Sequence, residues 1–197
     1  MNKQLASALF LFAASGCVNY TALTDIEPDG SGFVSIIVEV PLMEDAGMSI
    51  TDFGVADSTP GWELTFMSTD TLDTAVVYRL EGNFKNPGIL EDVFDIDNMT
   101  FEKEESGDVI RYHLSRPPVY MPASKFEGVF QSTGSMLKTA VKHGTDKYTW
   151  IEKLVLPGKI VEHNANKQKK DTLIWKVDIG DLTREGFLID VTWEVPK

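Results

Sequence analysis

The sequence predicts a mainly β protein: an antiparallel β-sandwich or curved sheet of about eight or nine strands, with one or two covering helices. Apolar and polar residues alternate with a period of two over most of the chain after residue 17. Short groups of glycine, proline and aspartate separate these runs and are typical of turns. We find no internal repeat and no linker, so residues 17–197 are expected to form one domain in which short turns join antiparallel neighbours.

The first half of the chain predicts four strands and a short helix. A β-hairpin is expected where two alternating runs flank the turn Pro28-Asp29-Gly30-Ser31-Gly32. The helix is expected after Asn86-Pro87, because these residues fit a helix cap and a first turn. Residues 42–60 give no clear signal. In chain order, the expected elements are strands at 19–26, 33–40, 62–66 and 75–84 and a helix near 89–94.

The second half predicts a further hairpin and then four strands. Three prolines between residues 117 and 122 block regular pairing. The segment 123–143 is the best candidate for a longer helix, although Gly128 and Gly134 weaken that prediction and a mobile flap is the alternative. The expected strands cover residues 99–104, 109–114, 148–156, 159–163, 172–179 and 187–195, with a polar turn at 164–171.

The first seventeen residues have the layout of an export signal. Lys3 is followed by the apolar run 5–14 and then by small residues that end at Cys17, the only cysteine. The run is shorter than the roughly 20 residues that span a bilayer. The end Ser15-Gly16-Cys17 resembles the lipobox of bacterial lipoproteins, in which leucine is commonest at the position of Ala14.

The lipobox resemblance implies that Cys17 is a lipidation site. Diacylglycerol would join its thiol, residues 1–16 would be removed as a signal peptide, and a fatty acid such as palmitate would usually acylate the new amino group. Two alternatives stay open: Cys17 is an ordinary thiol behind an ordinary signal peptide, or the segment is a buried N-terminal helix of a cytosolic protein.

Composition excludes several classes of function. The chain has 197 residues and a hydrophobic content of 43%, so it has enough apolar residues for a core. Its formal net charge is −12. Its acidity argues against nucleic-acid binding, which needs clustered lysine and arginine, and against adsorption to anionic lipid over a broad face. If Cys17 is lipidated, no thiol remains for a disulfide or a cysteine nucleophile.

The order of several turn and strand motifs resembles a bacterial envelope family, the LppM-type lipoprotein domain. The motifs follow Cys17 and the turn at 28–32, and they are Gly61-Trp62-Glu63-Leu64, Leu156-Pro157-Gly158-Lys159-Ile160-Val161, Asn164 and Leu173-Ile174-Trp175-Lys176-Val177. The resemblance spans most of residues 17–195 and implies a single domain of undefined activity without catalytic residues. Members often continue into a C-terminal transmembrane helix, whereas this chain stops at Lys197, which gives Cys17 more weight as an anchor.

No catalytic, cofactor-binding or metal-ligating residue is predicted. His113, His143 and His163 lie far apart, and no pair has the i, i+4 spacing of a helical zinc site. The segment Asp95-Ile96-Asp97-Asn98 lacks the glycine and the distant glutamate of a calcium loop. The chain has no G-x-S-x-G motif and no phosphate-binding loop, and serine, histidine and aspartate alone do not define a triad.

Two further groups of residues have an open interpretation. Lys167, Lys169 and Lys170 lie at a predicted hairpin tip, where they either contact phospholipid headgroups or keep the edge of the sheet charged and soluble. The tryptophans are most simply core residues, but they could instead line a cavity for an acyl chain; they are Trp62, Trp150, Trp175 and Trp193.

These observations predict a non-catalytic, lipid-anchored envelope lipoprotein that binds a protein partner or supports envelope assembly. The alternative is a lipid or glycolipid carrier with an apolar pocket between sheet and helix, walled by Trp175, Trp193 and the segment 123–143. A hydrolase is less favoured because no motif supports it. In a cell with two membranes we expect the outer membrane, because Val18 stands where aspartate commonly retains lipoproteins at the inner one; otherwise we expect the outer face of the plasma membrane.

Overall fold

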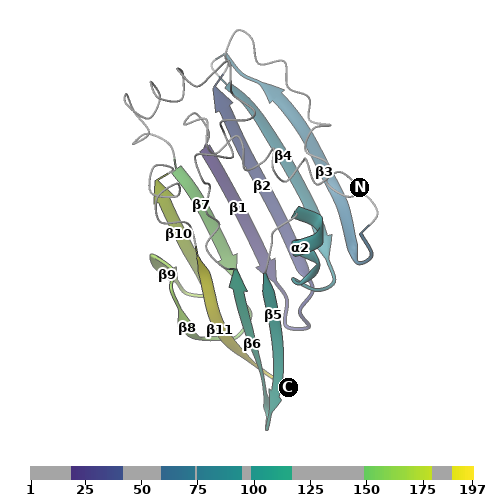
Figure 1. Cartoon of the computed structure of the whole chain (residues 1–197), viewed down its shortest axis with the longest axis vertical. Helices are drawn as coiled ribbons and strands as arrows, with labels where there is room; N and C mark the ends of the chain where they lie inside the picture. The colour runs from purple at the N-terminus through teal and green to yellow at the C-terminus, as the bar shows by residue number, and fades with distance from the viewer. Residues whose placement is uncertain (1–18, 42–58, 74, 95–98, 117–148, 179–187) are drawn as a thin grey trace, which may run out of the picture.

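Two packed β-sheets make up the protein (Figure 1). The computed structural model describes residues 19–41, 59–73, 75–94, 99–116, 149–178 and 188–197. These residues form eleven strands and the helix α2 (Ile89–Phe94). The strands are β1 (Asn19–Ile26), β2 (Gly32–Pro41), β3 (Trp62–Thr71), β4 (Ala75–Phe84), β5 (Thr100–Ser106), β6 (Val109–Arg116), β7 (Thr149–Val155), β8 (Lys159–His163), β9 (Lys167–Lys169), β10 (Thr172–Asp178) and β11 (Ile189–Pro196).

The larger sheet has the strand order β3-β4-β2-β1-β7-β10-β9 and the smaller one β5-β6-β11-β8. In Figure 1 the larger sheet runs from β3 on the right to β10 and β9 on the left. The strand pairs are antiparallel except for β1 and β7, which are parallel. This pair departs from the expected meander, because β7 returns to the first strand from a distant part of the chain rather than through a tight turn.

The predicted β-sandwich is therefore confirmed, and so are its hairpins. The structure describes eleven strands against the expected eight or nine. Ten of them overlap the strand ranges expected along the chain, whereas β9 falls in the expected polar turn and has only three residues, too few to show an alternation. The predicted helix at 89–94 is present as α2. The candidate helix at 123–143 and the segment 42–58 lie outside the described residues.

The turn between β1 and β2 is closed by its own residues. The backbone N–H of Glu27 donates to the carbonyl oxygen of Ser31 at 2.7 Å. The Asp29 carboxylate accepts hydrogen bonds from the backbone N–H and the hydroxyl of Ser31 at 2.9 and 2.6 Å. The Tyr112 hydroxyl in β6 donates to the carbonyl oxygen of Pro28 at 3.2 Å, which ties this turn to the smaller sheet.

The core lies between the inner faces of the two sheets, and alternation along the strands fills it. In β11 the residues Ile189, Val191, Trp193 and Val195 are buried, while the residues between them are partly exposed. Gly82 of β4 lies directly under the ring of Trp62, where a Cβ atom would clash with that ring. In the register Gly82 pairs with Leu64 and Trp62 pairs with Phe84, so the indole reaches Gly82 diagonally across β3 and β4.

Candidate functional site

An apolar cavity of about 70 Å³ lies between the two sheets. It is bounded by β1, β2 and β7 of the larger sheet and by β6 and β11 of the smaller one. Most of its lining residues are apolar or aromatic, which is the usual character of a small-ligand pocket. The lining residues are Tyr20, Ala22, Thr24, Val34, Ile36, Met99, Leu114, Arg116, Trp150, Glu152, Lys153, Leu154 and Ile189.

A buried ion pair supplies most of the polar character of this cavity. Arg116 is the last residue of β6 and Glu152 lies in β7, and their side chains are only 8% and 11% exposed. The Arg116 guanidinium donates two hydrogen bonds to the Glu152 carboxylate, from Nη1 to Oε1 at 3.0 Å and from Nη2 to Oε2 at 3.2 Å. This bidentate geometry joins the smaller sheet to the larger one through two charges.

Two aromatic residues complete the polar group. The indole N–H of Trp150 donates to Oε2 of Glu152 at 2.7 Å. The ring of Tyr20 stacks on that of Trp150 with centroids 3.7 Å apart. Burial raises the pKa of Tyr20 well above its usual range, and the negative charge of Glu152 raises it further, against the opposing effect of Arg116. Tyr20 therefore remains a neutral phenol at physiological pH.

The period of two predicts where these residues point. Arg116 follows Tyr112 and Leu114 at the inward positions of β6, and Glu152 stands between Trp150 and Leu154 at those of β7. A charged residue in the inward phase of a strand must be paired, because burying an isolated charge is very costly. That signal was present in the sequence and could have identified this pair, which the sequence analysis missed.

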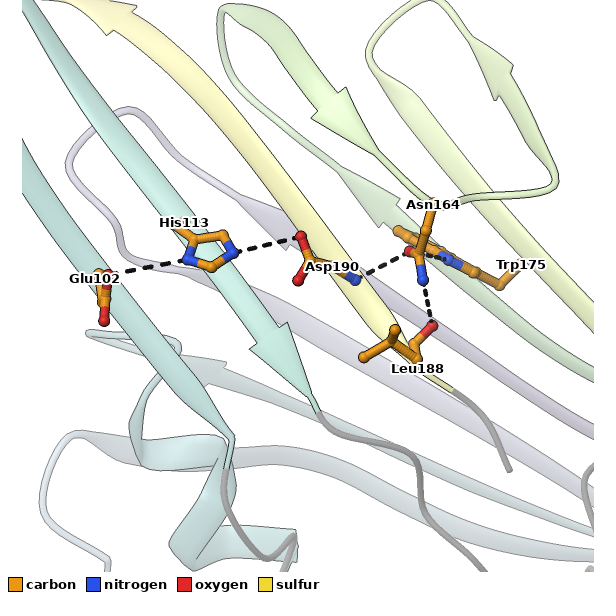
Figure 2. A network of polar contacts seen from close by, with 6 residues as sticks. All are labelled: Glu102, His113, Asn164, Trp175, Leu188 and Asp190. Carbon is orange, nitrogen blue, oxygen red and sulfur yellow. Dashed lines mark hydrogen bonds and ion pairs between the residues drawn. The ribbon is translucent and has the colours of Figure 1, made fainter. Parts of the chain in front are cut away.

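A second polar network joins the sheets at Asn164 (Figure 2). Its Oδ1 accepts hydrogen bonds from the Trp175 indole N–H of β10 at 2.9 Å and from the backbone N–H of Asp190 in β11 at 3.0 Å. Its Nδ2 donates to the carbonyl oxygen of Leu188 at 2.9 Å, and its backbone N–H donates to that of Asp190 at 3.1 Å. One side chain in the β8–β9 connection therefore binds both layers.

The histidines serve local contacts rather than a shared centre. His113 lies between Asp190 and Glu102 on the outer face of the smaller sheet, with nitrogen–oxygen distances of 3.4 and 3.9 Å (Figure 2). His163 lies 3.1 Å from the side-chain oxygen of Gln168. His143 and the segment 95–98 lie outside the described residues. Within the described ranges, no group of three histidine, cysteine, aspartate or glutamate residues could hold a metal ion.

The predicted lysine cluster lies at one edge of the larger sheet. Lys167 and Lys169 belong to the edge strand β9, and Lys170 lies in the turn to β10 with a positive φ of 55°. All three are exposed. The strand β10 separates β9 from β7, which carries Glu152.

The tryptophans divide between the cavity and the core. Of the four, Trp150 lines the cavity, whereas Trp175 and Trp193 are buried elsewhere, at 2% and 0% exposure. Trp193 stacks on Tyr112 with ring centroids 5.2 Å apart. Trp175 and Trp193, which were expected as cavity walls, therefore do not line this cavity, because their indoles are buried in the core between the sheets. The third expected wall, residues 123–143, is outside the described part.

The predicted lipidation site, Cys17, precedes the described residues, which begin at Asn19. In the part of the chain that the structure describes, no helix is long and apolar enough to cross a membrane.

Comparison with solved structures shows the fold. The folded domain of the Mycobacterium tuberculosis LppM protein, determined by NMR, matches with a TM-score of 0.53 and 11% sequence identity, over 92% of this chain and 91% of that chain. A crystal structure of an M1 zinc metallopeptidase mutant from Deinococcus radiodurans matches at a TM-score of 0.24 and 10% identity, over 90% of this chain and 42% of that one. This TM-score is too low to indicate a shared fold. No family model matches the sequence. No curated protein matches it either.

The chain therefore has the LppM-type fold, as the order of its motifs predicted. The likeness extends over most of both chains, but at this identity it shows the fold alone. What the domain does must be argued from its own residues.

Proposed function

We propose that this protein is a lipid-anchored lipoprotein of the bacterial cell envelope that binds the apolar part of an amphiphile between its two sheets and catalyses no reaction. The observation that carries the proposal is the apolar cavity with its buried Arg116–Glu152 pair. The lipobox at Ser15-Gly16-Cys17 supports the anchor. The cavity favours the lipid or glycolipid carrier over the other functions expected from the sequence.

The size of the cavity limits what enters it. One water molecule needs roughly 10–15 Å³ on this scale, so about 70 Å³ accommodates a short apolar segment of roughly five or six heavy atoms. The rest of the ligand would remain outside the two sheets. The ligand is therefore an amphiphile that inserts the end of its chain between the sheets and keeps its polar part outside.

Filling the cavity tests the binding function. Ala22 is 2% exposed and lines the cavity, so Ala22→Leu places three further carbons in it. Titration with the fluorescent fatty acid cis-parinaric acid should show binding to the wild-type chain and at least a tenfold weaker affinity for Ala22→Leu, since three such carbons displace contacts worth about 2 kcal/mol.

Ala75→Leu is the matched control, because Ala75 is equally buried at 4% exposure but does not line the cavity. Overpacking costs both variants about 1–3 kcal/mol of stability, so thermal melting must show that each remains folded. If Ala22→Leu does not fold, Ala22→Val is measured instead. Equal binding by wild type and the Ala22 variant would contradict the proposal.

The anchor is tested separately by intact mass and detergent partitioning of wild type and Cys17→Ser. We expect an acylated mature wild type in the membrane fraction and loss of both properties in the variant, because two or more acyl chains make anchoring stable. An unmodified mature mass would indicate an exported protein without a lipid anchor.

A second candidate function is the binding of a protein partner. It rests on the edge of the larger sheet that is formed by β3, opposite to the edge formed by β9. β3 is the last strand of that sheet among the described residues, and it exposes Phe66 and Met67 at 46% and 42%. A long edge strand with large apolar side chains is a template for pairing with another chain. Photo-crosslinking from position 66 in cells should capture an envelope protein, and β3 would not be an interface if crosslinks form only within the chain.

A further inference from the structure

We propose that the outer face of the larger sheet over β7, β10 and β9 lies flat on the anionic surface of the membrane. Its headgroup contacts would be Lys153, Lys167, Lys169 and Lys176. The proposal rests on the proposed anchor at Cys17 for its orientation, and it goes beyond that anchor by naming the face of the domain that meets the lipid.

The strand registers bring these four lysines to one face. Paired residues of neighbouring strands point to the same side of a sheet. Ile174 of β10 pairs with both Lys153 of β7 and Lys167 of β9, and Thr172 pairs with Lys169. Ile174 and Thr172 alternate with the buried Leu173 and Trp175, so they and their partners point away from the core.

Lys176 belongs to the same outward set, two residues beyond Ile174. It pairs with Ile151 of β7, which in turn pairs with Thr21 of β1. The lysines therefore extend over three adjacent strands rather than over the hairpin tip alone. In Figure 1 these strands, β7, β10 and β9, form the left part of the larger sheet.

These charges are available for an external partner. Lys167, Lys169 and Lys176 are exposed, whereas Lys153 is half-buried and also borders the cavity between the sheets. Within the described residues, none of the four takes part in an ion pair. The acidic residue in the outward phase of these three strands is Asp178, at the end of β10.

Apolar side chains lie between the lysines. Ile151, Val155 and Ile174 point outward from β7 and β10 and are only half-buried. A face that combines lysine with aliphatic residues suits the boundary between headgroups and acyl chains, since the lysine stems cover apolar surface while their ammonium groups contact phosphate.

The overall acidity of the chain argues against adsorption over a broad face, but it acts only weakly on this local face. The formal net charge is −12, but charges separated by more than a Debye length, about 8–10 Å, are largely screened. The acidic run Glu102, Glu104 and Glu105 lies on β5 of the smaller sheet. Packed sheets are about 10 Å apart, so this run lies beyond that distance from the outer face of the larger sheet.

The anchor would hold this face at the membrane. Cys17 precedes Asn19, the first residue of β1, by two positions, which span at most roughly 7 Å. β1 is the direct neighbour of β7. An acylated Cys17 therefore leaves the domain too close to the membrane to turn freely, and the lysines determine which face it presents.

The test is flotation of the whole chain carrying Cys17→Ser with phosphatidylcholine vesicles, with and without phosphatidylglycerol. Comparing the two kinds of vesicle removes the contribution of the apolar residues 5–14, which does not depend on lipid charge. We expect binding to rise with phosphatidylglycerol and to fall with added salt. Each lysine should contribute roughly a fivefold increase in partitioning.

We then expect phosphatidylglycerol-dependent partitioning to be at least about tenfold weaker in the variant Lys167→Gln/Lys169→Gln/Lys176→Gln than in wild type, since each lysine contributes about 1 kcal/mol. The matched control is Lys85→Gln/Lys103→Gln/Lys159→Gln, which changes three exposed lysines on other elements. Both variants lower the formal charge from −12 to −15, by removing three positive charges. Only the face of the molecule differs between them.

An equal loss in both variants would overturn the proposal, since net charge rather than this face would then control binding. Wild-type binding that does not respond to phosphatidylglycerol would overturn it as well. Neither result would change the acylated mass of wild type or its binding of cis-parinaric acid, so failure here is distinguishable from failure of the proposed function. If the triple variant does not fold, the double variant Lys167→Gln/Lys169→Gln on the edge strand replaces it.

Discussion

Among single residues, two ion pairs of similar length differ in their surroundings. Arg111 and Glu194 form a pair at 2.6 Å on the outer face of the smaller sheet, with side chains 50% and 19% exposed. The Arg116–Glu152 pair is longer, at 3.0 Å, but both partners are buried. Water competes for the first pair and not for the second, so burial rather than distance decides how strongly the fold depends on each.

We therefore predict that Arg116→Met lowers the free energy of unfolding by about 3–5 kcal/mol, because it leaves the Glu152 carboxylate buried without its cation. Arg116→Met/Glu152→Leu should recover much of this loss. Urea denaturation of the three chains measures both effects. The matched control Arg111→Met should have a much smaller effect, and an equal loss in Arg111→Met and Arg116→Met would contradict the argument.

The turn at Asp29 gives a prediction for pH. Hydrogen bonds from the hydroxyl and the backbone N–H of Ser31 hold the pKa of Asp29 below its usual range. The contribution of this group to stability is therefore present above the ordinary aspartate pKa and is lost as the pH falls through the lowered value. In Ser31→Ala the Asp29 pKa should move up toward its ordinary value, as NMR titration of the carboxyl carbon would show; an unchanged pKa would mean that the hydroxyl is not its main cause.

The connection between β8 and β9 shows how a short element can hold larger ones. β9 has three residues, and the loop before it contains Asn164, whose side chain contacts β10 and the start of β11. The loop is polar in sequence. The two sheets have no backbone strand pairing with each other, and the side-chain amide of Asn164 links them instead. The β8–β9 connection thus helps to hold the two sheets together at the edge of the core.

Asn164→Ala should destabilise the protein by about 1–3 kcal/mol, since it leaves the Trp175 indole N–H and backbone groups near Asp190 without partners. Hydrogen exchange should accelerate at the Trp175 indole and at the Asp190 amide, while β1 and β2 keep their protection. Asn83→Ala is the control, because Asn83 is exposed on β4. Uniformly faster exchange in every strand would instead indicate a global effect of the mutation.

Alternation and turn residues were enough to predict most of the strands, because each strand buries one face and exposes the other. Pairing between distant strands was not predictable in this way: nothing local in β1 specifies β7 as its neighbour. An apolar cavity was expected as an alternative, but its lining was not predictable in this way, since its buried ion pair joins residues of different sheets. The lysine face was seen only at Lys167, Lys169 and Lys170, because Lys153 and Lys176 join it through the registers.

At the scale of the whole molecule, the described residues form one hydrophobic core that the two sheets share. Residues from both layers, including Trp175 of the larger sheet and Trp193 of the smaller, belong to a single buried cluster. The Arg116–Glu152 pair and Asn164 add polar links between the same layers. Neither sheet can lose its partner without exposing its own apolar face, so the two should unfold together.

We predict one cooperative unfolding transition, with coincident midpoints by far-ultraviolet circular dichroism and tryptophan fluorescence. Trp193→Leu, at a position with 0% exposure, should lower the midpoint in both signals by the same amount. Its cost should be about 2–4 kcal/mol, below that of a full truncation to alanine. Two separate transitions, or a shift in only one signal, would show that the layers unfold independently.

The parallel pairing of β1 with β7 has a consequence for how the protein is made. Thr149 and Asn19, which are joined by a hydrogen bond at the start of these strands, are 130 residues apart in the chain. During synthesis the first hairpin emerges long before its neighbour, and closing so large a loop makes the step slow. The same order holds during the proposed export. For that interval one edge of β1 lacks its partner strand. Crossing the membrane as an extended chain, and folding only after the last strands have followed, would suit this topology.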